Sequence, residues 1–139
     1  MNNNVELFKE VLQSQGIRYS ILCKQLDSVV INVSCQSQIN SVQFRVSDGG
    51  SVYVSSVLGT VAEGQECHVL KKLNALMLKN EYLQLTMQGN QIVCKYTFAI
   101  PWGKENENRD FIAVYIAMIM SLFDWATHNT FSLWRETYE

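Results

Sequence analysis

The sequence predicts an α+β fold, in which helices at the start, in the middle and at the end of the chain pack against an antiparallel meander sheet. Apolar residues recur at helical spacing in three stretches, and two intervening stretches alternate polar and apolar residues with a period of two. The chain has 139 residues with one Pro, and no linker or repeat divides it. We therefore expect a single domain over 1–139.

The first helix and the strands after it differ in the period of their apolar residues. Apolar residues from Val5 to Leu12 share one helical face, and Gly16 is typical of the position just after a helix. From 17 to 59 the period becomes two, with β-branched and aromatic runs separated by turn residues. This stretch predicts four strands.

Two loops set the expected register of the sheet. A three-residue loop at 48–50 keeps apolar side chains opposite one another, whereas a two-residue loop would set them opposite serines. Gly89 and Asn90 suit a two-residue type II′ loop within a hairpin over 82–100. The expected cross-strand pairs are Val46 with Val52, Phe44 with Val54, Met87 with Ile92, Leu85 with Cys94 and Leu83 with Tyr96.

Two further helices complete the predicted fold. Apolar residues from Val69 to Met77 predict a middle helix over 64–80. After Pro101 and a polar loop, Asn108 is a suitable N-cap for a long C-terminal helix over about 109–128.

The C-terminal helix carries more apolar surface than one sheet can cover. Its small and polar residues share one narrow stripe, and apolar residues fill the rest of its circumference. Either the first helix or a second copy of the chain must cover the remainder. The stripe consists of Ala113, Ala117, Ser121, Asp124 and His128.

The last residues, 129–139, form a C-terminal aromatic extension. They include Phe131, Leu133, Trp134 and Tyr138, and free tails seldom carry so many large apolar groups. Two interpretations stay open. The extension fills a gap on its own domain, or it serves dimerisation or partner docking.

Composition excludes several classes of protein. Hydrophobic residues make up 47% of the chain and the net charge is -2, so neither nucleic acid nor a membrane surface is an expected partner. The apolar run 111–123 is shorter than the roughly 20 residues that span a bilayer, which favours a buried helix. The N-terminus lacks the pattern of a secretory signal, and we expect a cytoplasmic protein.

The four cysteines show no zinc-ligand spacing, so in a reducing compartment they are best interpreted as small apolar core residues. Cys23, Cys35 and Cys94 share the apolar parity of their strands, which predicts three buried free thiols.

Asp124 and His128 are the strongest candidates for acid–base chemistry, because a spacing of four places them side by side on a helix. No further ligands complete a metal site, so we interpret them as an ion pair near the helix end. The sequence has no glycine-rich phosphate loop and no assembly of nucleophile, base and orienting group. We therefore expect no catalytic residue, no cofactor and no metal.

Three segments carry a resemblance to a known family, and they are VELFKEVLQSQGIRY, the stretch 51–102 and the closing SLFDWA. In these segments the chain resembles the YbjN family, whose fold is shared with the dimeric chaperones of bacterial type III secretion. Leu73-Asn74 looks like the family's recurring Leu-Asn pair, and Gly89 looks like its hairpin glycine. The resemblance to the family covers about 5–126 and implies a non-enzymatic, dimeric, chaperone-like or regulatory adaptor.

We therefore expect an adaptor that binds another protein or peptide and forms a homodimer. The alternative is a small-molecule-sensing regulatory domain with a pocket between the sheet and the C-terminal helix. An exposed apolar groove or strand edge would favour the adaptor, and a closed pocket with converging polar groups would favour the sensor. The candidate interface residues are Ile116, Met120, Trp125, Phe131 and Trp134.

Overall fold

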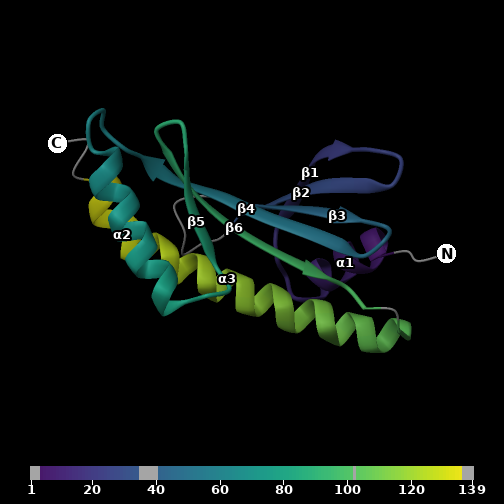
Figure 1. Cartoon of the computed structure of the whole chain (residues 1–139). Helices are drawn as coiled ribbons and strands as arrows, with labels where there is room; N and C mark the ends of the chain where they lie inside the picture. Colours follow the sequence, from purple (N-terminus) through teal and green to yellow (C-terminus); the bar gives the residue numbers. More distant parts are fainter. Residues whose placement is uncertain (1–3, 35–40, 102, 136–139) are drawn as a thin grey trace.

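The computed structural model describes residues 4–34, 41–101 and 103–135. Its helices pack against a six-stranded sheet with the strand order β1-β2-β3-β4-β6-β5, and every neighbouring pair is antiparallel (Figure 1). This confirms the predicted α+β class. The elements in chain order are α1 (Asn4–Ser14), β1 (Tyr19–Lys24), β2 (Ser28–Val33), β3 (Val42–Ser47), β4 (Ser51–Thr60), α2 (Glu66–Lys79), β5 (Gln84–Gln88), β6 (Gln91–Ala99) and α3 (Glu105–Arg135).

Both predicted hairpin loops are confirmed. Gly50 and Gly89 have φ values of 99° and 62°, and glycine adopts positive φ without steric strain because it has no Cβ. Leu83 lies just outside the ladder, because β5 begins at Gln84. The confirmed pairs are Val46 with Val52, Phe44 with Val54, Met87 with Ile92 and Leu85 with Cys94.

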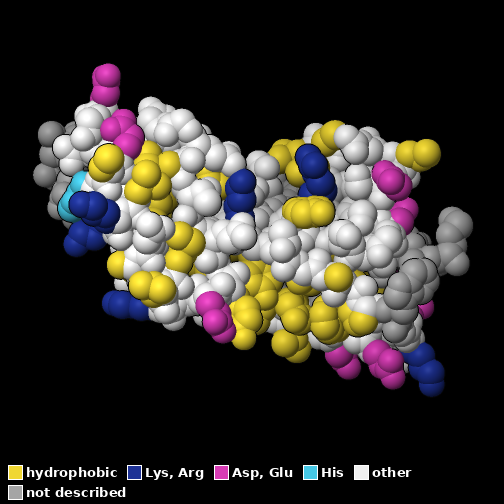
Figure 2. All heavy atoms as spheres, in the orientation of Figure 1, with side chains coloured by type: hydrophobic (Ala, Val, Ile, Leu, Met, Phe, Trp, Pro, Cys, Tyr) yellow, Lys and Arg dark blue, Asp and Glu magenta, His cyan; other side chains and the backbone are white. Residues whose placement is uncertain are grey.

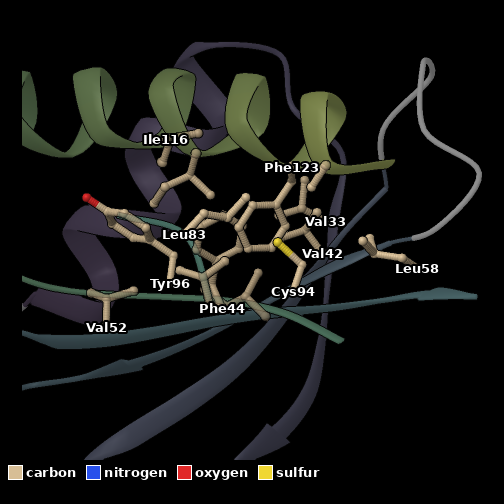
Figure 3. Packing of buried hydrophobic residues seen from close by; sticks show 14 of the residues in the cluster. Val33, Val42, Phe44, Val52, Leu58, Leu83, Cys94, Tyr96, Ile116 and Phe123 are labelled. Carbon is tan, nitrogen blue, oxygen red and sulfur yellow. The ribbon is translucent and has the colours of Figure 1, made fainter. Parts of the chain in front are cut away.

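The helices lie on one face of the sheet and enclose the core. α1 packs on β3 and α3, α2 packs on β5, and α3 packs on β4 and β6. Figure 3 shows Ile116 and Phe123 of α3 pointing toward the strands, where Phe44 and Cys94 lie. Four α3 residues at spacings of three and four are fully buried there, and they are Ile112, Ile116, Ile119 and Phe123.

α3 is longer than the predicted helix at both ends. It begins at Glu105, so Asn108 is a buried residue inside the helix, and the prediction that it caps the helix is wrong. At the other end the Thr127 and Thr130 hydroxyls donate to the carbonyls of Phe123 and Ala126 at 2.8 Å, so they are satisfied within the helix. Apolar periodicity marks only the part of a helix that packs on the sheet, which explains the difference.

Residues 129–135 of the expected extension are the last turns of α3, and they pack on their own chain. Leu133 and Thr130 are buried, and the Trp134 side chain lies directly over Gly59 of β4. Gly59 follows a register shift in the pairing of β4 with β6, where the strand bends. Of the two interpretations, packing on the same domain therefore applies to 129–135, whereas Tyr138 lies outside the described residues.

Gly59→Ala should loosen this contact, because a Cβ at position 59 would overlap the Trp134 side chain. We expect the free energy of unfolding to fall by about 1–3 kcal/mol, the usual cost of overpacking. Urea unfolding measures this change, and hydrogen exchange should show faster opening of 129–135.

Gly49→Ala is the matched control, since its new Cβ would meet no atom closer than 4.0 Å. In a Trp134→Ala background the added cost of Gly59→Ala should shrink, because the indole atoms that overlap the new Cβ are removed and only the Cβ of residue 134 remains near it. An equal cost for the two glycine substitutions in the wild-type background would contradict the contact.

Candidate functional site

β5 is shorter than β6, and this leaves the last part of β6 unpaired on one edge of the sheet. Gln84, the first residue of β5, pairs with Lys95, whereas β6 continues to Ala99. Beyond Lys95, β6 pairs with β4 on one side, and no other strand in the described part of the chain pairs with it. An unpaired strand edge of this kind is a place where another polypeptide can dock.

An aromatic cluster joins this edge to α3. The Phe98 and Tyr115 rings stack with centroids 4.8 Å apart, and the Phe111 and Tyr115 rings stack at 4.4 Å. Tyr96 extends the cluster along β6, with its ring centroid 6.3 Å from that of Phe98. Pairs at these separations stabilise a contact beyond the area that they bury.

Further apolar side chains continue the cluster along α3. Val114 is 65% exposed, and the neighbouring apolar side chains of this surface are half-buried. The surface is therefore partly exposed to solvent in the single chain. From Phe111 to Trp125 it runs for about 21 Å at 1.5 Å per residue. Figure 2 shows hydrophobic side chains gathered along the lower side of the molecule, over α3. We call this surface the α3 face, and it consists of Phe98, Phe111, Val114, Tyr115, Met118, Leu122 and Trp125.

The opposite flank of α3 is covered by α1. Arg109 of α3 binds Glu10 of α1 at 2.5 Å and Glu105 at 3.0 Å. The hydrogen bonds that Arg109 donates to the carboxylates of Glu105 and Glu10 raise the pKa of its guanidinium. The first helix therefore covers one flank of the wide apolar arc, and the α3 face is the part that it does not reach.

Tyrosine hydroxyls form a polar rim beside the α3 face. Burial raises the pKa of Tyr96, and the nearby Tyr115 and Tyr82 raise it further. The Tyr82 side chain is exposed and precedes β5. An apolar centre with a polar rim is the usual anatomy of a protein–protein interface.

The predicted interface residues do not form one surface. Ile116 is fully buried in the core, so no partner can contact it in the folded chain. Trp134 packs on Gly59, and Met120 and Phe131 are half-buried outside the α3 face. Only Trp125 belongs to that face, because the rotation of α3 about its axis cannot be read from a helix that is apolar over most of its circumference.

Asp124 and His128 lie side by side near the end of α3. The His128 Nδ1 atom is 3.6 Å from Asp124 Oδ1 and 2.9 Å from the Asp124 carbonyl oxygen. In the part of the chain that the structure describes, no group of three His, Cys, Asp or Glu residues is placed to hold a metal ion. The pair has the geometry of a helix-surface contact.

Surface hollows in the described part of the chain include two that could hold a ligand. A cleft of about 400 Å³ lies between α2 and the end of α3, and a shallow hollow of about 290 Å³ lies on the uncovered face of the sheet. Neither lies between the sheet and α3, where Phe44 and Phe123 fill the space. The residues of the α2–α3 cleft include His68, Lys72, Leu76, Lys79, Asn129 and Ser132.

The cysteines differ from the prediction. Cys94 is buried as expected, but Cys23 is exposed, and the prediction that it is buried is wrong. β1 is an edge strand whose register shifts between Ile21 and Cys23, so its parity does not continue, and every residue of β1 after Tyr19 is exposed. Cys67 is exposed on α2, and Cys35 lies outside the described residues.

β1 also exposes apolar side chains at the far edge of the sheet. Ile21 and Leu22 are about half exposed, and Leu26 in the following turn is fully exposed. Together they form a second and smaller apolar edge, on the opposite side of the sheet from β5.

No family model and no curated protein matches the chain. Among solved structures, an uncharacterized protein from Methanothermobacter thermautotrophicus is similar with a TM-score of 0.49 and 8% sequence identity. The match covers 85% of this chain and 96% of that chain. The resemblance to the YbjN family therefore stays a prediction.

By length and composition alone, residues 105–134 of α3 could cross a membrane. Core helices of soluble proteins meet the same criterion, and here the buried stripe of α3 packs on the sheet.

Thiol labelling should separate the cysteines. Burial raises the pKa of the Cys94 thiol, so it stays protonated and shielded at neutral pH. We expect Cys23 and Cys67 to react quickly with a thiol reagent in the native state and Cys94 to react only on unfolding. Peptide mass spectrometry identifies the labelled sites, and fast labelling of Cys94 in the folded protein would contradict the core packing.

Proposed function

We propose that this chain is a cytoplasmic, non-enzymatic adaptor that forms a homodimer through the α3 face and binds another protein or peptide. The α3 face carries the proposal, since its seven neighbouring apolar side chains on β6 and α3 are partly or mostly exposed in the single chain. Large contiguous apolar patches on a folded domain usually mark interaction sites. The resemblance to the YbjN family, which implies a dimeric adaptor, supports the same function.

Charges at the two ends of α3 favour a second copy as the occupant of this face. Near its start Glu105, Glu107 and Asp110 outnumber the neighbouring cations Lys104 and Arg109. Near its other end lies α2, which contains three lysines and one acid, Glu66, with Glu63 and Glu81 in the segments on either side of it. Figure 2 shows mainly acidic side chains, with a basic one beside them, at the lower right and basic side chains below acidic ones at the left, with the apolar surface between the two ends.

A twofold axis near Met118 would match these features. Two antiparallel α3 helices would then place the acidic start of each beside the basic α2 of the other. Phe111 would lie near Trp125 of the partner, and Val114 would lie near Leu122 of the partner. The exposed small residues Ala117 and Ser121 border the face and would allow the two helices to approach closely.

Val114→Glu combined with Met118→Glu should convert the dimer to a monomer. Val114 is mostly exposed, so a charge there costs the single chain little, and a symmetric interface feels each charge twice. In sedimentation equilibrium the wild type is expected at about 32 kDa, twice the chain mass of 15.9 kDa, and the variant at about 16 kDa.

Leu26→Glu is the matched control, because Leu26 is exposed but lies outside the α3 face, and this variant should remain a dimer. Circular dichroism checks that each variant is folded. A wild type that sediments as a monomer at micromolar concentrations would overturn the homodimer. Ile116→Glu does not test the dimer interface, because Ile116 is fully buried and a charge in the core would unfold the chain.

A further inference from the structure

The face of the sheet opposite the helices is polar and carries only positive charge. The six strands contain three cations, Lys24, Arg45 and Lys95, and neither Asp nor Glu. The whole chain nevertheless has a net charge of -2, and the acidic residues that the structure describes lie in helices and loops. In the described residues no carboxylate lies within 4.0 Å of Arg45 or Lys95.

The register brings these two cations to one hollow. Arg45 on β3 pairs with Tyr53 on β4, and Tyr53 pairs with Thr97 on β6. In the next row Ser55 of β4 pairs with Lys95 of β6. One strand separates β3 from β6, and Lys95 lies two residues along β6 from Thr97, so the backbones at Arg45 and Lys95 are about 12 Å apart. The hollow of about 290 Å³ is lined by Val30, Gln43, Arg45, Tyr53, Ser55, Gln84, Lys95 and Thr97.

The shape of the hollow suits an extended chain better than a compact ligand. A second hollow of about 170 Å³ shares Gln43 and Ser55 with it, so the two form one open trough across the strands. Small-molecule sites are usually enclosed, whereas this trough is open and is lined by both polar and apolar atoms. Tyr53 is 59% exposed beside it and offers a large flat contact. Figure 2 shows separate basic side chains over the middle strands, with polar surface between them.

We propose that this trough binds an extended, acidic segment of another polypeptide. Carboxylates of the segment would pair with Arg45 and Lys95, and an apolar or aromatic side chain would pack on Tyr53. Arg45 and Lys95 are within reach of two acidic residues two to four positions apart on an extended segment. This inference rests on the proposed adaptor function and names the chemistry of its partner.

The trough and the α3 face are independent surfaces. The side chains of Arg45 and Lys95 lie on the uncovered side of the sheet, and α3 packs on the other side. A dimer assembled through the α3 face would therefore leave both troughs open. Single-stranded nucleic acid also binds cations and aromatic rings, but a single exposed aromatic residue lines this trough among the described residues.

Fluorescence anisotropy with labelled probes tests the proposal on the full chain. The probes are a short peptide of alternating Glu and Tyr, a peptide of alternating Lys and Tyr of equal length, and an oligothymidylate of similar length. We expect the acidic peptide to bind most tightly and to weaken as salt rises. Arg45→Glu combined with Lys95→Glu should weaken its binding about tenfold or more, and Tyr53→Ser should weaken it about threefold or more.

Lys71→Glu combined with Lys104→Glu is the matched control, because it changes the net charge equally at exposed sites outside the trough. This variant should keep the affinity within about twofold. Amide chemical shifts that change on β3, β4 and β6 would locate the peptide in the trough. Equal loss of binding in both double variants would overturn the proposal, and so would tighter binding of the oligothymidylate.

Peptide binding and sedimentation test the trough and the homodimer separately. The Val114→Glu, Met118→Glu monomer should bind the acidic peptide as tightly as the wild type, and the trough variants should sediment as dimers. A wild-type dimer that binds no acidic peptide would overturn the trough alone. Peptide binding by a wild-type monomer would overturn the dimer alone.

Discussion

The packing of one helix stripe on the inner face of the sheet determines the rest of this structure. Ile112, Ile116, Ile119 and Phe123 of α3 are fully buried against strands whose inward residues are nearly all apolar. Burying such side chains is the main favourable contribution to folding, and close packing leaves little freedom to rotate the helix. Once this stripe faces the sheet, the positions of the α3 face and of Trp134 over Gly59 follow.

The sheet separates two kinds of surface. On the side of the helices, the short β5 leaves part of β6 uncovered, and α1 covers only one flank of α3. Apolar surface therefore remains where α3 meets β6. On the other side the outward residues are polar, and Arg45 and Lys95 supply charge of one sign. The first surface suits a second copy of the chain, and the second suits an acidic segment of a different polypeptide.

Local patterns predicted most of the fold. The loop at 48–50 and the loop at Gly89 set the strand registers, because turn length and side-chain parity must agree within a hairpin. The same parity rule failed at Cys23, where a register shift in an edge strand interrupts the alternation. It also could not place the ends of α3, since residues outside the packed stripe show no apolar period.

The amino-acid sequence by itself determined the elements, the pairing within the hairpins at 48–50 and 89–90, and the excess of apolar surface on the C-terminal helix. It also determined that the strands contain no acid, although the cationic hollow became visible only when the register placed Arg45 and Lys95 near Tyr53. Only the tertiary structure decided which part of the wide apolar arc stays uncovered. A helix that is apolar over most of its circumference has no preferred rotation of its own, so the rotation of α3 is set by side chains far apart in the sequence, such as Phe44 and Phe8.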